Sequence, residues 1–70
     1  MQDNTSVDKY ADLRVVGIRV AAEITDLAPA TLSRMRSEGS GPQVTQLSPG
    51  RYGYRLADLR AWLESRRVSA

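Results

Sequence analysis

One of the three prolines, Pro29, constrains the fold of this chain more than any other residue. Proline disfavours a helix interior but suits the first helical position, so a helix is predicted to begin at Pro29 and run to about Glu38, where Gly39 stops it. A shorter helix is predicted just before it, because four residues follow one another at helical spacing and therefore share one helix face. These residues are Ile18, Ala21, Ala22 and Thr25. Only residues 26–28 join the two helices, so they must cross steeply and leave one face of the second helix exposed.

The chain after these helices alternates like β-structure and then becomes helical again. The further predicted elements are strands at 43–47 and 52–55, a turn at 48–51 that joins them into a hairpin, and a helix at 57–67. Val15 and Val16 are β-branched and predict a short strand ahead of the first helix. The predicted fold class is therefore mostly α with a small β-hairpin, arranged as a winged helix-turn-helix.

The sequence lacks both cysteine and histidine. The chain therefore has no thiolate or imidazole to act as nucleophile, general base or metal ligand. We expect a protein that is not an enzyme and that has no cofactor and no metal site. No apolar run approaches the roughly 20 residues needed to cross a bilayer, and the polar, acidic N-terminus is unlike a signal peptide. We therefore expect a cytoplasmic protein with no membrane partner.

Positive charge is concentrated in the second part of the chain. Residues 28–70 contain seven arginines and three acidic residues, a net charge of +4, whereas residues 1–27 have a net charge of −2. The planar guanidinium group offers paired donors that suit phosphates and guanine edges. An arginine-rich segment of this kind is typical of proteins that bind polyanions, and nucleic acid is the first candidate. The alternative is an ordinary solvated surface.

The exposed face of the helix at 29–38 is the candidate DNA-reading surface. A helix fits the major groove, which is about 12 Å wide, and short side chains let its backbone approach the bases. The residues predicted to face the major groove are Ala30, Ser33, Arg34 and Ser37. The residues predicted to contact phosphates are Arg19, Thr31, Arg36 and Arg55. The alternative for Ser33 and Arg34 is a solvated helix face.

The hairpin supplies a second candidate contact. Its tip contains Gly50, which leaves room for a groove wall, and Arg51, which is predicted to enter a narrow minor groove. A solvated turn arginine is the alternative. Tyr54 and Trp62 are expected in the core rather than stacked on bases, because the chain has no phenylalanine to fill that core. For Tyr52 both roles stay open.

The same residues form one longer pattern. Its runs are Ala21-Ala22-Glu23-Ile24, Leu27-Ala28-Pro29-Ala30-Thr31-Leu32, Gly39…Gly41-Pro42 and Tyr54-Arg55…Asp58-Leu59…Trp62-Leu63. Over residues 15–67 this pattern resembles the MerR-like winged-helix module of phage excisionases and AlpA-type regulators. The chain departs from that family at Met35, where tryptophan is frequent, and at Gly17 and Ala28, where capping residues are usual. The missing cap at Ala28 costs the helix around 1 kcal/mol.

The resemblance implies that the helix beginning at Pro29 enters the major groove and that the hairpin touches the minor groove. Excisionases of this family bind adjacent sites near a phage attachment site, bend the DNA and help integrase run recombination towards excision. We therefore expect a sequence-specific, architectural protein in the cytoplasm of the bacterial host, associated with the nucleoid. Its expected partners are double-stranded DNA, phage integrase and further copies of itself on adjacent sites.

Two other functions remain open. An AlpA-like or MerR-like transcriptional regulator would use the same helix face, but MerR-type factors normally carry an effector domain after this module. Here only residues 68–70 follow, as a tail, which favours the excisionase. The second alternative is an integrase-binding adaptor that makes no contact with DNA.

The domain boundaries follow from the same pattern. Residues 15–67 are predicted to form the DNA-binding domain, and residues 1–14 a polar extension with a short helix over 8–13 capped by Ser6. The strand at Val15 and Val16 is an apolar edge with no evident partner in the chain. We therefore expect this strand, or the N-terminal segment, to contact another copy of the protein.

Overall fold

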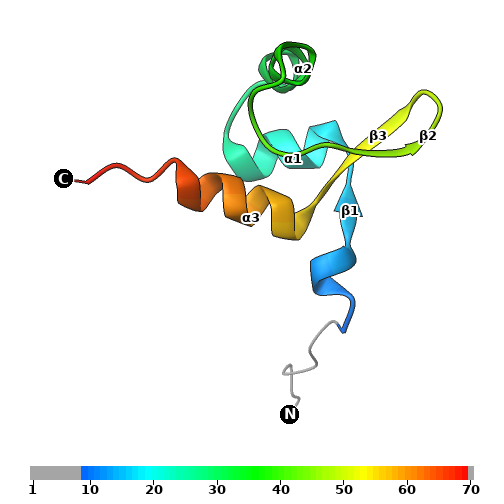
Figure 1. Cartoon of the computed structure of the whole chain (residues 1–70), viewed down its shortest axis with the longest axis horizontal. Helices are drawn as coiled ribbons and strands as arrows, with labels where there is room; N and C mark the ends of the chain where they lie inside the picture. The colour runs from blue at the N-terminus through cyan, green and yellow to red at the C-terminus, as the bar shows by residue number, and fades with distance from the viewer. Residues whose placement is uncertain (1–8, 70) are drawn as a thin grey trace.

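The computed structural model describes residues 9–69. In this part of the chain, seven elements follow one another (Figure 1): the 3-10 helix η1 (Ala11–Leu13), β1 (Val15–Val16), α1 (Ile18–Thr25), α2 (Pro29–Glu38), β2 (Thr45–Ser48), β3 (Arg51–Arg55) and α3 (Leu56–Ser65). The strands form a three-stranded antiparallel sheet with the order β1-β3-β2. The architecture is therefore mixed α/β, with more sheet than the single hairpin predicted from the sequence.

Strand β1 completes the sheet by pairing with β3. The register places Val15 opposite Arg55 and Val16 opposite Tyr54. The expectation that the Val15 and Val16 edge has no partner within the chain is therefore wrong. Strand β3 uses one edge for its hairpin partner β2 and offers the other edge to a strand far earlier in the sequence. Pairing over such a distance leaves no local signal in the sequence.

The turn between α1 and α2 is held by the backbone. Asp26 adopts a left-handed conformation with φ 59°, which aspartate tolerates better than most residues that carry a Cβ atom. The N–H of Leu27 donates to the carbonyl of Ala22 at 3.2 Å. Helix α2 begins at Pro29, as predicted, and Ala28 just before it provides no side-chain cap. The turn is thus short enough to make the two helices cross steeply.

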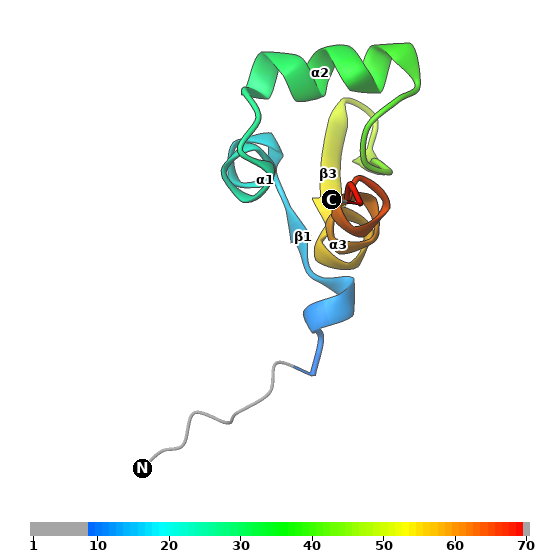
Figure 2. The same ribbon diagram turned by 90° about the vertical axis from the view of Figure 1, so that its left-hand side faces the viewer.

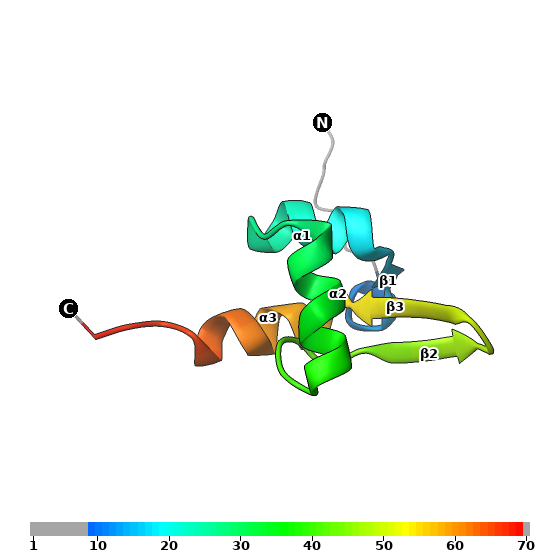
Figure 3. The ribbon, with the colours of Figure 1, turned by 90° about the horizontal axis from the view of Figure 1, so that it is seen from above.

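The core lies where the helices meet the sheet, and α2 crosses over both α1 and α3 (Figures 2 and 3). Its buried members are Ala21, Ala22, Leu32, Tyr54 and Leu59. The two alanines of α1 allow a close approach of α2, so that Leu32 and Leu59 are each only 1% exposed. Trp62, predicted to lie in the core, is half-buried and lies outside this cluster.

Three predicted elements have different bounds in the structure. The strands of the hairpin span Thr45–Ser48 and Arg51–Arg55, so the turn between them is tighter than predicted. Helix α3 ends at Ser65, two residues earlier than the prediction. The hydroxyl group of Ser65 donates to the carbonyl of Trp62 at 2.6 Å, a local bond with which serine competes against the helical pattern.

The N-terminal helix is shorter than predicted. The sequence pattern predicts a helix over residues 8–13, whereas among the described residues 9–13 only Ala11–Leu13 is helical, as a single 3-10 turn. Tyr10 and Leu13 are 57% and 63% exposed, so the apolar spacing that suggested a longer helix does not correspond to a buried face. The predicted cap, Ser6, lies outside the described residues.

Gly53 in the middle of β3 gives a direct test of the three-stranded sheet. A Cβ atom at this position would clash with Cγ1 of Val15 and lie 3.2 Å from the carbonyl oxygen of Val16. We expect Gly53→Ala to destabilise the protein by about 1–3 kcal/mol. This corresponds to a melting temperature lower by at least about 4 °C in thermal unfolding followed by circular dichroism.

Gly17→Ala is the matched control, because nothing lies within 4 Å of a Cβ atom built at Gly17. Its effect on the free energy of unfolding should stay below about 1 kcal/mol. Equal melting temperatures for the two variants would contradict the close approach of β1 to β3.

Candidate nucleic-acid interface

The predicted base-reading residues lie on α2, whose outer side is not covered by the other described elements (Figure 3). Ala30, Arg34 and Ser37 are exposed, in agreement with their predicted orientation. Ser33 is half-buried, and so is Thr31, one of the predicted phosphate contacts. The full burial of Leu32 on the inner side fixes which face of the helix points outward. The structure thus brings three of the four predicted groove residues to one exposed face.

Arg34 is not alone on this face. One of its guanidinium nitrogens, Nη1, lies 3.6 Å from Oε1 of Glu38, one helical turn further on. The two side chains are 61% and 54% exposed, and an ion pair this exposed contributes about 0–1 kcal/mol. The spacing of four residues between Arg34 and Glu38 is the sequence feature that predicts this ion pair. Because the pair is weak, the guanidinium group of Arg34 can exchange Glu38 for another acceptor at little cost.

Arg36 points in a different direction from Arg34. Its guanidinium carbon lies 4.4 Å from the centre of the Tyr52 ring, so the side chain joins the last turn of α2 to the second residue of β3. Sequence reasoning missed this contact. The available signal was strand alternation, which puts Tyr52 on the same face of β3 as the buried Tyr54 and therefore towards the helices.

The hairpin tip is small and exposed. Pro49 and Gly50 form the turn, and Gly50 has φ 80°, a conformation that favours glycine. Arg51 follows at the start of β3, is exposed, and makes no ion pair with any described residue. In Figure 1 the tip extends away from the helices to the right and lies on the same upper side of the view as α2. The structure thus leaves the predicted contact at Gly50 and Arg51 accessible.

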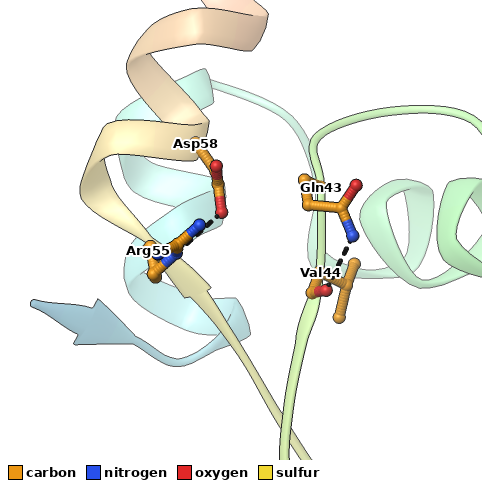
Figure 4. Close-up of polar contacts among 4 residues, drawn as sticks. All are labelled: Gln43, Val44, Arg55 and Asp58. Carbon is orange, nitrogen blue, oxygen red and sulfur yellow. Dashed lines mark hydrogen bonds and ion pairs between the residues drawn. The ribbon is translucent and has the colours of Figure 1, made fainter. Parts of the chain in front are cut away.

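Two of the predicted phosphate contacts, Arg19 and Arg55, lie neither on α2 nor at the tip of the hairpin. Arg19 is exposed in the first turn of α1 and makes no ion pair within the described part of the chain. The Nε atom of Arg55 donates to Oδ2 of Asp58 at 3.1 Å, at the junction of β3 and α3 (Figure 4). Asp58 is 20% exposed, so Arg55 is held against the start of α3 at the base of the hairpin rather than at its tip. On the segment before β2, the side-chain amide of Gln43 donates to the carbonyl of Val44 at 3.1 Å (Figure 4).

A second group of arginines lies on α3 and just beyond it, on the side of the molecule opposite to the hairpin tip (Figure 1). Its members, all exposed, are Arg60, Arg66 and Arg67. Arg67 pairs with Glu64 at 3.3 Å, and the guanidinium carbon of Arg66 lies 5.7 Å from the centre of the Trp62 ring. The positive charge counted in the sequence is thus divided between two surfaces.

The described residues offer little that could form a ligand pocket, a metal site or a membrane-spanning segment. A shallow pocket of about 220 Å³ lies at the end of α2 and is lined by Arg36 and residues 39–44. Within residues 9–69, no cluster of three or more histidine, cysteine, aspartate or glutamate residues could hold a metal ion. In the same range, none of the helices combines the length and the apolar character needed to cross a membrane.

The burial of Tyr54 makes the protein less stable at alkaline pH. Burial raises the pKa of its phenol group above the usual value, and the positive charge of Arg36 only partly offsets this effect. In the unfolded chain the phenol ionises near pH 10, whereas in the folded protein it keeps its proton to a higher pH. Stability that is present below about pH 10 should therefore be lost as the pH rises beyond that value.

Thermal unfolding between about pH 8 and pH 11 tests this expectation. Tyr54→Phe should lose less stability than the unmodified protein over this range. Tyr52→Phe, which changes an exposed tyrosine of the same strand, should show the full loss. If Tyr54→Phe and the unmodified protein lose stability in parallel, burial of this phenol is not the cause.

No family model matches the chain, and no curated protein or solved structure is significantly similar to it. What points to a function is therefore the molecule's own geometry. The features that count are the exposed face of α2, the accessible tip of the hairpin and the arginines that both present.

Proposed function

We propose that this chain is a winged helix-turn-helix protein that binds double-stranded DNA in a sequence-specific way, with α2 in the major groove. One observation carries the proposal: Arg34 stands on an exposed helix face between the short side chains of Ala30 and Ser37. The short neighbours let the helix backbone approach the base edges. Arg34 then has the reach and the paired donors to bind O6 and N7 of a guanine.

The other contacts follow from the same docking. The β2–β3 hairpin acts as the wing, and its tip brings Gly50 and Arg51 to the minor groove, where arginine favours a narrow groove. Thr31 and Arg19 contact phosphates beside the major groove, together with Arg36. Arg55 would have to leave its ion pair with Asp58 before it could bind a phosphate, so it contributes least.

We further propose the role of an excisionase of the MerR-like family. In this role the protein bends DNA at a phage attachment site and directs integrase towards excision, in the cytoplasm of the bacterial host. The succession of α1, a three-residue turn, α2, hairpin and α3 supports this role, as does the sequence pattern that resembles the family. Several copies would occupy adjacent sites and contact integrase. Strand β1 pairs with β3 through one edge and is an outer strand of the sheet, so its other edge, or the N-terminal segment, would supply the contacts between copies.

Replacing Arg34 tests the major-groove contact. Against duplexes selected from a random library, Arg34→Ala should lower the affinity by about 1–3 kcal/mol, roughly 5-fold to 150-fold, since a bidentate contact is lost. Preference for guanine should also relax at one position of the site. Fluorescence anisotropy with the selected duplex and its single-base variants measures both effects.

Arg60→Ala is the matched control, because Arg60 is an exposed arginine on α3 that makes no ion pair with a described residue. It should leave the base preference unchanged. Loss of base preference in the Arg60 variant but not in the Arg34 variant would contradict docking through α2. A protein that binds no duplex but co-purifies with integrase would be the adaptor.

A circular-permutation gel shift on attachment-site DNA separates the excisionase from a transcriptional regulator. An excisionase should bind several adjacent sites and change the mobility of the complex according to where the site lies in the fragment, because bent DNA migrates more slowly when the bend is central. Binding with no bend would contradict the architectural role and favour the regulator.

A further inference from the structure

The contact between Arg36 and Tyr52 differs from the other cation–ring contacts of the described residues. Its distance of 4.4 Å is the shortest, against 5.9 Å for Lys9 over Tyr10 and 5.7 Å for Arg66 over Trp62. Those two pairs join residues that are close in sequence. The Arg36 pair instead joins two different elements, α2 and β3, which are separated in the chain by β2.

The guanidinium group of Arg36, which lies over the Tyr52 ring, keeps its hydrogen-bond donors available. Arg34, Arg55 and Arg67 each pair with a carboxylate, whereas Arg36 makes no ion pair or side-chain hydrogen bond with any described residue. A cation over the face of a ring is attracted through its charge and needs no hydrogen-bond acceptor there, so the N–H groups of Arg36 can still donate to another group. Arg36 is therefore a donor held in place without an acceptor of its own.

The surroundings of Arg36 suit an anion. The shallow pocket beside it is lined by residues 39–44, among which there is no acidic side chain. Tyr52 is 44% exposed, so the pair is accessible from solvent rather than sealed in the core. An oxyanion can thus approach the edge of the guanidinium group without meeting a carboxylate from these neighbours.

In the proposed complex, Arg36 and Tyr52 lie where a strand of the DNA would pass. A helix in the major groove and a wing in the adjacent minor groove are separated by one sugar–phosphate strand. That strand must pass between α2 and the hairpin, which is where Arg36 and Tyr52 meet. This step rests on the proposed function, because it requires both groove contacts to form on one duplex.

We propose that Arg36 and Tyr52 form a phosphate clamp for the DNA strand that separates the two grooves. Arg36 donates to one phosphate of that strand. Tyr52 is a positioning residue that holds the guanidinium plane ready, so that less side-chain entropy is lost on binding. The clamp fixes the register between the recognition helix and the wing and reads no base.

The salt dependence of binding tests the clamp, because it counts phosphates neutralised by the protein. In plots of log affinity against log salt, Arg36→Ala should reduce the magnitude of the slope by about 1, equally for all duplex sequences. Tyr52→Leu should have the same effect, and Tyr52→Phe, which keeps the ring, should restore the slope. In the Arg36→Ala background, Tyr52→Leu should change nothing further.

Tyr10→Leu is the matched control, because Tyr10 is an exposed tyrosine next to η1 with a cation near its ring. Its slope should equal that of the unmodified protein. Melting curves of each variant check that the fold is kept, and the Arg36→Ala slope decides the outcome if Tyr52→Leu fails to fold.

An unchanged slope in Arg36→Ala would overturn the clamp, and so would additive effects of the two substitutions. Failure of the clamp is distinguishable from failure of the proposed function. If Arg34→Ala relaxes base preference while Arg36→Ala leaves the slope unchanged, the clamp and the phosphate contact of Arg36 are wrong, but docking through α2 stands. If the unmodified protein binds no duplex at any salt concentration, the proposed function is wrong, and the clamp falls with it.

Discussion

The packing of α2 on α1 is the contact on which the rest of the structure depends. Ala21 and Ala22 present almost no side chain to the crossing point, so α2 comes close enough to bury Leu32 almost completely. This buried leucine fixes the rotation of α2 about its axis, because turning the leucine side chain outward would lose about 1.5–3 kcal/mol of hydrophobic stabilisation. The exposed face that carries Arg34 is therefore a consequence of what lies beneath it.

The sheet fixes the second half of the surface. Pairing of β1 with β3 ties the base of the hairpin to the start of α1, and Tyr54 on β3 enters the same core as Leu32. The hairpin can therefore extend well beyond the helices without losing its orientation. The contact of Arg36 with the Tyr52 ring adds a direct link between α2 and the hairpin. Helix and hairpin thus form one surface although each is anchored separately.

The sequence predicts those features that a few neighbouring residues determine. Pro29 and Gly39 define α2 because each acts on the backbone where it stands, and the Pro49-Gly50 turn defines the hairpin in the same way. The β1–β3 pair and the contact of Arg36 with Tyr52 join distant parts of the chain. Both depend on how the core places one element against another. Strand alternation indicates which way Tyr52 points, but no local pattern identifies Arg36 as its partner or β3 as the partner of β1.

We propose that the outer face of α2 and the tip of the hairpin bind DNA together. The most direct measurement is the change in backbone amide NMR shifts when the labelled protein is titrated with a selected duplex. We expect the largest changes to fall in two stretches at once, residues 29–38 and 49–52, and to saturate at the same DNA concentration. Changes confined to the arginines of α3, or no change in either stretch, would contradict this proposal.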